Sequence, residues 1–303
     1  MTPSPTFSGI AALPALGVIR AQGADAAKFL HGQLTQDFSL LGLSEARLAA
    51  FCSPKGRMLA SFVAAKRAHD DIVLVCRRDL LPATLKRLQM FVLRAQCKLS
   101  DASDALALRG LVGDAVPAAL PAPDWSQWRD GEASVLRLPA ADGVARALWI
   151  APLEGSPAPE TTLDTAVWDW LSVRSGVATV GAAVADAFVP QMLNYESVGG
   201  VNFKKGCYPG QEVVARSQFR GTLKRRGVLL AASGPVAAGQ EVFHAADAEQ
   251  PCGLIAEAAP RPDGSGWEAI AALQTSALDG GALRAGDATL TPQPLPYPLR
   301  DDI

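Results

Sequence analysis

The chain has 303 residues, which suits roughly two domains of about 150 residues each. Hydrophobic residues make up 49% and charged residues 19%, a composition that supports a buried core and argues against intrinsic disorder. The 28 basic and 30 acidic residues give a net charge of −2, which excludes a generally cationic nucleic-acid-coating protein.

The cysteines and the N-terminus point to a reducing compartment. The five cysteines lie at positions 52, 76, 97, 207 and 252, an odd number at wide spacing that is not a disulfide framework. There is no CxxC and there are only three histidines, so we expect neither a zinc site nor an iron–sulfur cluster held by this chain alone. The first residues lack a basic region and Pro14 interrupts their apolar stretch, so no signal peptide is predicted. No apolar run approaches the ~18 residues of a membrane span, and we therefore expect a cytoplasmic protein.

The segments before residue 150 read as a mixture of strands and helices. Strand-like runs occupy residues 17–20, 46–52, 57–66, 71–77, 105–112 and 145–150. A helix is predicted to start within 23–30, where an acidic residue suits its first turn, and leucines spaced three and four residues apart predict another over 80–94. The sequence Ser53-Pro54-Lys55-Gly56 is typical of a hairpin turn, which we favour over a phosphate-binding loop.

The sequence pattern changes twice in the second half of the chain. Residues 155–159 predict a linker or loop, and an apolar pattern resumes over 167–173. After residue 226 come short strand-like pieces at 227–232, 241–243, 252–258 and 267–273, with a turn at 262–266. Strands mixed irregularly with helices predict an α+β fold. We expect a core over 1–225, with room for two subdomains, and a small β-barrel domain over 226–303.

The stretch from 202 to 216 carries the most chemical information. Pro209-Gly210 predicts a turn, with Gly210 as the N-cap of a helix beginning at Gln211. Cys207 would then lie near a helix N-terminus and after two lysines, surroundings that lower the pKa of a thiol. The alternative is that Cys207 is a small buried side chain in a tight turn. For the other four cysteines we expect core packing.

Basic residues are concentrated between positions 204 and 226. Seven basic residues against one acidic residue give this segment a charge of +6, which leaves −8 for the rest of the chain. The basic residues are Lys204, Lys205, Arg216, Arg220, Lys224, Arg225 and Arg226. Such a ridge suits an anionic partner, such as a carboxylate-bearing cofactor tail, a phosphate or an RNA backbone. The alternative is an ordinary solvated face.

Motifs of several common enzyme classes are absent from the sequence. It contains no G-x-x-x-x-G-K-[ST], no G-x-G-x-x-G after a strand, no H-E-x-x-H and no G-x-S-x-G. Nucleotide hydrolysis, nicotinamide chemistry and serine esterase activity therefore have no support.

The run Lys204-Lys205-Gly206-Cys207-Tyr208-Pro209-Gly210-Gln211-Glu212, followed by Ala215-Arg216, resembles the signature of the YgfZ family. These are folate-binding proteins related to the aminomethyltransferase (T-protein) of the glycine cleavage system. Further segments resemble the family in the same order along the chain: residues 23–25, 29–37, 53–58, 190–200 and 295–297. The resemblance spans essentially the whole chain.

This resemblance implies an aminomethyltransferase-like, folate-binding core around a central channel, followed by a β-barrel. It also implies tetrahydrofolate as cofactor and a role in making or maintaining iron–sulfur enzymes, including radical enzymes that thiolate tRNA. It assigns the chemistry to Cys207 with Lys205. Contacts to the cofactor are implied for the residues around them: Gly206, Tyr208, Gly210, Gln211, Glu212 and Arg216. Trp168 matches an aromatic residue associated with folate, and an indole is suited to stacking on a pterin. The alternative for Trp168 is core packing.

The chain departs from its relatives at two positions near the implied folate site. Relatives often carry a glutamate where this chain has Arg174, which presents only donors, and some carry a tryptophan near Leu16. Two other functions stay open. One is a folate-dependent aminomethyl- or methyltransferase acting on a small amine. The other is an interaction module that binds RNA or protein through residues 204–226.

Overall fold

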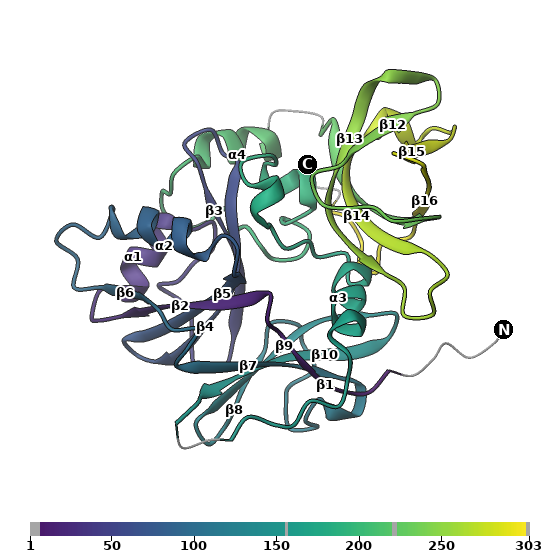
Figure 1. Cartoon of the computed structure of the whole chain (residues 1–303). Coiled ribbons are helices and arrows are strands. Elements are labelled where there is room, and N and C mark those ends of the chain that lie inside the picture. The colour runs from purple at the N-terminus through teal and green to yellow at the C-terminus, as the bar shows by residue number, and fades with distance from the viewer. Residues whose placement is uncertain (1–6, 155–156, 220–222, 301–303) are drawn as a thin grey trace.

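The computed structural model describes residues 7–154, 157–219 and 223–300, and these form two antiparallel sheets, a β-barrel and four α-helices (Figure 1). The helices are α1 (Ala26–Gln33), α2 (Leu81–Gln89), α3 (Thr165–Arg174) and α4 (Gln211–Phe219). None of the described helices reaches the length and hydrophobicity that crossing a bilayer requires. Residues 155 and 156 of the predicted linker lie outside the described residues, and 157–159 form neither helix nor strand.

The first sheet has the strand order β3-β4-β5-β2-β6. Its strands are β2 (Leu16–Gln22), β3 (Ala46–Cys52), β4 (Met58–Ala68), β5 (Asp71–Arg77) and β6 (Lys98–Asp101). The predicted hairpin is confirmed, because β3 and β4 pair antiparallel and the Gly56 amide donates to the Ser53 carbonyl at 2.8 Å. The helix predicted over 80–94 is too long. It ends at Gln89, and Leu93 adopts a left-handed conformation (φ 45°) as the chain turns towards β6.

The second sheet has the strand order β1-β7-β10-β9-β8. Its strands are β1 (Gly9–Ala12), β7 (Leu106–Val112), β8 (Gln127–Asp130), β9 (Ala133–Ala141) and β10 (Val144–Pro152). The sequence pattern predicted β7 and β10 but not β9, because Pro139 lies within β9 and proline is unusual inside a sheet.

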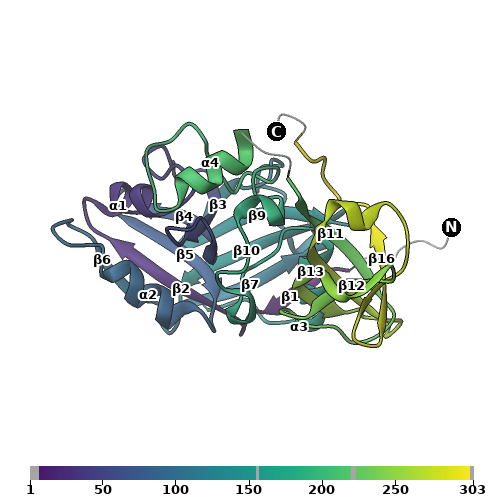
Figure 2. The ribbon, with the colours of Figure 1, turned by 90° about the horizontal axis from the view of Figure 1, so that it is seen from above.

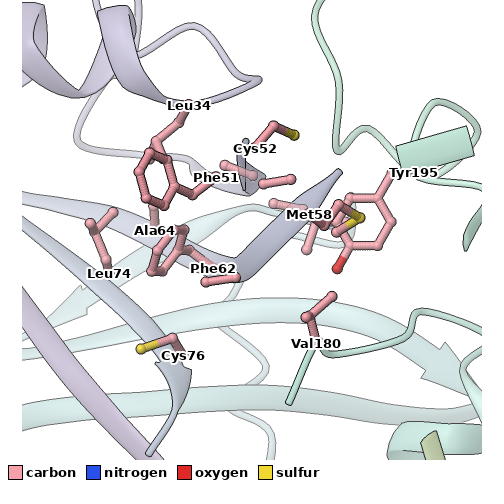
Figure 3. Packing of buried hydrophobic residues seen from close by; sticks show 14 of the residues in the cluster. Leu34, Phe51, Cys52, Met58, Phe62, Ala64, Leu74, Cys76, Val180 and Tyr195 are labelled. Atoms are coloured by element: carbon pink, nitrogen blue, oxygen red, sulfur yellow. The ribbon is translucent and has the colours of Figure 1, made fainter. Parts of the chain in front are cut away.

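Two apolar clusters pack against the first sheet, one on each of its faces. Val73 and Val75 of the first sheet pack in one cluster with Leu148 and Ile150 of the second, so the sheets face each other. The opposite face of the first sheet packs against α1, α2 and the segment 178–201, as Figure 3 shows around Tyr195. The core is therefore a sandwich with a further layer on the first sheet.

The C-terminal strands close into a barrel in the order β11-β14-β13-β12-β15-β16. They are β11 (Arg225–Ala232), β12 (Glu241–His244), β13 (Asp247–Pro260), β14 (Trp267–Gln274), β15 (Leu283–Ala285) and β16 (Ala288–Gln293). The predicted α+β class with a C-terminal barrel is confirmed. Figures 1 and 2 place the barrel beside the two sheets, at the end far from α1 and α2. Helix α3 packs against β13 and β14 and so joins the barrel to the core.

Candidate functional site

A cavity of about 100 Å³ lies where the two sheets, α3 and barrel strand β13 meet. This space is several times what one water molecule needs. Two open grooves share residues with it. Leu48 and Trp125 also line a groove of about 440 Å³ whose rim includes Asn202. Leu13 and Leu16 also line a second groove, of about 270 Å³. The arrangement fits the predicted channel through the core.

One face of α3 forms a wall of this cavity. Thr165, Trp168, Asp169 and Ser172 all line it, at the spacing of residues on one face of a helix. The helix begins after Asp164, whose side chain accepts a hydrogen bond from the Ala166 amide at 2.9 Å. The N-cap thus fixes the start of the helix that presents Trp168 and Asp169.

Four charged side chains face the cavity from four different elements. Arg77 ends β5, Arg146 lies in β10, Asp169 in α3 and Glu257 in β13. Within the described part of the chain, no ion pair joins these arginines to these carboxylates, and the buried Nε atoms of Arg77 and Arg146 have no hydrogen-bond partner. Because buried charges are normally paired with each other, this set of unpaired charges marks the cavity as a candidate site.

The pKa values of these groups shift as expected for charges removed from water. Burial raises the pKa of Glu257 to about 7, although a hydrogen bond from the Thr179 amide and the charges of Arg77 and Arg146 oppose the shift. Burial also raises the pKa of Asp169 and lowers that of Arg146 to about 10. Such perturbed groups in a cavity are typical of functional sites.

We expect Glu257→Gln to stabilise the ligand-free protein at pH 8 but not at pH 4. The folded protein binds the Glu257 proton more tightly than the unfolded chain, so wild-type stability falls as pH rises from 4.5 to about 7. Glutamine keeps an acceptor for Thr179 and does not ionise. The raised pKa corresponds to a free energy of unfolding that is of the order of 3 kcal/mol higher for Glu257→Gln than for the wild type at pH 8. Urea unfolding of both proteins at the two pH values measures it, and equal stabilities at pH 8 would contradict it.

Trp168 is buried in the cavity wall with Arg146 against its ring. The guanidinium carbon of Arg146 lies 4.6 Å from the ring centroid. The ring also lies directly against Gly110, where a Cβ would come within 2.3 Å of Cε3. The structure therefore confirms that Trp168 packs in the core, and because the residue also lines the cavity, its contact with folate stays a prediction.

Arg174, the departure noted in the sequence, does not face this cavity. It is the last residue of α3 and binds Asp142 through two hydrogen bonds of 2.9 and 2.5 Å. Its Nη1 also lies 3.6 Å from the carboxylate of Glu268 in β14. The arginine is thus neutralised between the second sheet and the barrel.

The cysteine motif forms a turn that docks on the β3–β4 hairpin. Gly210 has a φ of +79°, and a Cβ there would lie 2.4 Å from the Ser53 carbonyl oxygen, so the contact requires glycine. The Gly210 carbonyl accepts hydrogen bonds from the amides of Val213 and Val214, which starts α4 at Gln211 as predicted. Cys207 therefore lies four residues before a helix of nine residues.

Lys205 is buried beneath this turn. Its ammonium donates to the carbonyl oxygens of His31 and Leu34, the latter at 3.0 Å, at the C-terminal end of α1. It also lies 4.6 Å from the ring centroid of the buried Tyr208. Burial lowers the pKa of Lys205 to about 8, against the opposing charges of Asp37 and Cys207. Lys205 thus ties the motif to α1.

Cys207 is the one exposed cysteine of the five, which overturns the alternative of a buried side chain. The other four are buried, as predicted, and burial raises the pKa of Cys52 and Cys76 to about 12. The residue before Cys207 lies beside an imidazole, because a Cβ on Gly206 would be 3.3 Å from Nε2 of His31. Nδ1 of His31 lies 3.1 Å from a carboxylate oxygen of Asp37.

The segment 204–226 is not a continuous basic ridge. Lys205 and Arg226 are buried, and Arg226 forms an ion pair with the buried Glu196. Arg216 is exposed and pairs with Glu212 at 2.7 Å. Lys204 and Lys224 are exposed and Arg225 is partly buried, whereas Arg220 lies outside the described residues. The prediction of one exposed cationic surface is therefore wrong at these two positions, because the side chains of Lys205 and Arg226 turn inward.

The structure separates the predicted site residues into two places. Trp168 lines the cavity, whereas none of the described residues 205–216 does so. The groove at Trp125 lies near both regions, since it shares Leu48 and Trp125 with the cavity and its rim includes Asn202, whose side chain accepts a hydrogen bond from the Lys204 amide at 2.8 Å.

Sequence reasoning missed Arg77, Arg146, Asp169 and Glu257. A signal was present for two of them. Arg146 and Glu257 are single charged residues inside apolar runs predicted as strands, at 145–150 and 252–258. A charge in such a run is unusual enough to predict a buried site.

Comparisons with known proteins agree with this picture. No protein-family model matches the chain. A tRNA-modifying protein YgfZ from Yersinia pseudotuberculosis (serotype O:1b, strain IP 31758) is 30% identical over 307 residues, covering 94% of this chain and 91% of the relative. The chain belongs to the YgfZ family. A second YgfZ protein, from Enterobacter sp. (strain 638), is 31% identical over 300 residues, covering 92% and 90% of the two chains. The family resemblance inferred from the cysteine motif is thus confirmed.

The YgfZ-family chain also resembles a solved aminomethyltransferase in fold. The glycine cleavage system aminomethyltransferase T from Bartonella henselae matches with a TM-score of 0.69 over 95% of this chain and 85% of that one. The two are 16% identical in sequence, so the likeness shows the fold alone. It confirms the predicted aminomethyltransferase-like architecture.

Proposed function

We propose that this protein binds tetrahydrofolate in the central cavity and serves the biogenesis or repair of iron–sulfur enzymes, including those that thiolate tRNA. The observation that carries the proposal is the cavity with its unpaired charges beside the buried Trp168. Its relatives are named as tRNA-modifying proteins, and its fold is that of an aminomethyltransferase. The pterin would occupy the cavity, and the tail would extend along the groove towards Asn202.

Cys207 would perform the chemistry with the client enzyme. It is exposed, whereas the other cysteines are buried, and it lies within a turn that is held in place by Lys205 on one side and Gly210 on the other. The thiol would handle sulfur, one-carbon or cluster intermediates at the surface. Lys205 would position the turn, and the His31 ring beside Gly206 is held by its contact with Asp37. The five free cysteines suit the reducing cytoplasm in which we place the protein.

Calorimetric titration with tetrahydrofolate under anaerobic conditions tests the folate part of this proposal. We expect saturable binding with one site per chain, and clear weakening in Trp168→Phe, which keeps an aromatic ring but loses part of the cavity wall. Arg284→Gln, at an exposed position of barrel strand β15 that does not line the cavity, is the matched control and should bind as the wild type does. No heat of binding to the folded wild-type protein would refute folate binding.

The same mixture of protein and tetrahydrofolate, with a small amine donor added, tests whether the protein is a transferase. If the protein converts tetrahydrofolate and a small amine donor into a one-carbon adduct over many turnovers, it is a folate-dependent transferase. We expect binding without such turnover.

A further inference from the structure

The carboxylate of Glu257 reaches the cavity because of an irregularity in the barrel. Along β13, Ile255 and Ala258 pack inside the barrel, whereas Ala256 and Ala259 pack on the core side. Strict alternation would place Glu257 beside Ile255, in the apolar barrel interior. The pairing of β13 with β14 shifts register between Ile255 and Glu257, so two consecutive side chains face the core. Such bulges commonly redirect a side chain towards a site.

Only one oxygen of this carboxylate is used by the protein. Oε2 of Glu257 accepts a hydrogen bond from the Thr179 amide at 2.8 Å. Oε1 receives no hydrogen bond from any residue that the structure describes, and the side chain keeps part of its surface open where it lines the cavity. An unused carboxylate oxygen deep in the fold is costly unless a ligand supplies donors.

A buried positive charge lies on another wall of the same cavity. Arg146 is 3% exposed, and its Nη2 donates to the Ser172 hydroxyl at 2.6 Å. Its Nε is buried and has no partner among the residues described. The cavity therefore presents a free acceptor, Oε1 of Glu257, in the same space as the guanidinium of Arg146 and the ring of Trp168, and such an acceptor suits the edge of a flat heterocycle that carries N–H donors.

We propose that Glu257 recognises the edge of the pterin that carries the 2-amino group and N3–H. This proposal rests on the proposed function, since it names the residue that selects the ring. Relatives often carry a glutamate where this chain has Arg174, and Arg174 is bound to Asp142 and Glu268. Glu257 would therefore supply the carboxylate in this cavity. The charged groups that face Glu257 are Arg77, Arg146 and Asp169.

The test compares two ligands on three proteins. The ligands are tetrahydrofolate and its analogue with hydrogen in place of the 2-amino group, and the proteins are the wild type, Glu257→Gln and Asp169→Asn. We expect the wild type to bind the analogue at least about tenfold more weakly, the value of one well-made hydrogen bond to a charged group. Glu257→Gln should bind tetrahydrofolate more weakly and lose most of this preference, whereas Asp169→Asn should retain it.

Binding to the wild type should also tighten between pH 6 and pH 8, as the Glu257 carboxyl ionises, and this dependence should disappear in Glu257→Gln. Circular dichroism and urea unfolding establish that each variant is folded. If the wild type binds tetrahydrofolate and Glu257→Gln keeps the full preference for the 2-amino group, or Asp169→Asn loses it instead, our assignment of Glu257 is wrong although folate binding stands. If the folded wild type binds neither ligand, the proposed function itself fails.

Discussion

Replacing Cys207 with alanine is expected to abolish rescue of a bacterial strain that lacks its own YgfZ-family gene. The wild-type gene should restore the activity of iron–sulfur enzymes and the level of thiolated tRNA, and Cys207→Ala should leave both at the level of the empty vector. The side chain is exposed, so its loss should change the free energy of unfolding by less than about 0.5 kcal/mol. The defect would therefore be chemical rather than structural.

Two further variants sharpen this result. Cys207→Ser keeps the shape of the side chain but removes the thiol, and it should fail as alanine does. Cys97→Ala removes a buried thiol elsewhere and should rescue as the wild type does. Full rescue by Cys207→Ala at wild-type expression would show that the exposed thiol is not needed.

The largest effect on stability is expected at the ion pair between Glu196 and Arg226. The Glu196 side chain is fully buried and that of Arg226 is 11% exposed, and the pair links the segment after residue 190 to barrel strand β11. Asn194 adds two hydrogen bonds to the next residue of the strand, Gly227. Removing one member of a buried pair leaves an uncompensated charge, so Arg226→Met should lower the free energy of unfolding by about 3–5 kcal/mol.

Urea unfolding measures this effect, with Arg216→Met as the matched control. Arg216 pairs with Glu212 on the exposed face of α4, and its loss should cost less than about 1 kcal/mol. The double variant Glu196→Leu/Arg226→Met should be more stable than Arg226→Met alone, because the uncompensated charge is gone. Equal losses in the two single arginine variants would mean that burial does not strengthen the inner pair.

Local sequence patterns were sufficient for the parts of the fold that depend on neighbouring residues. The Ser53–Gly56 turn, the helix start after Gly210 and the barrel strands β11 to β14 follow from turn chemistry and short-range periodicity, whereas β15 and β16 were not predicted. Strand β9 could not be predicted in this way, because Pro139 lies within it. The end of α2 could not be predicted either, because it depends on the turn that brings β6 to pair with β2.

Charge alone could not tell which basic side chains face the solvent. Arg226 turns inward to meet Glu196, 30 residues earlier in the chain, and Lys205 reaches the carbonyl groups at the end of α1. The cavity charges come from four elements that only the tertiary fold brings together. Of these, Glu257 also depends on a bulge, which no alternating pattern predicts.

Crystals of the protein grown with 5-formyltetrahydrofolate would test the central claim most directly. We predict electron density for the pterin inside the cavity, against Trp168 and within hydrogen-bonding distance of Glu257. Ordered folate bound elsewhere on the folded chain, with the cavity filled only by water, would contradict the account.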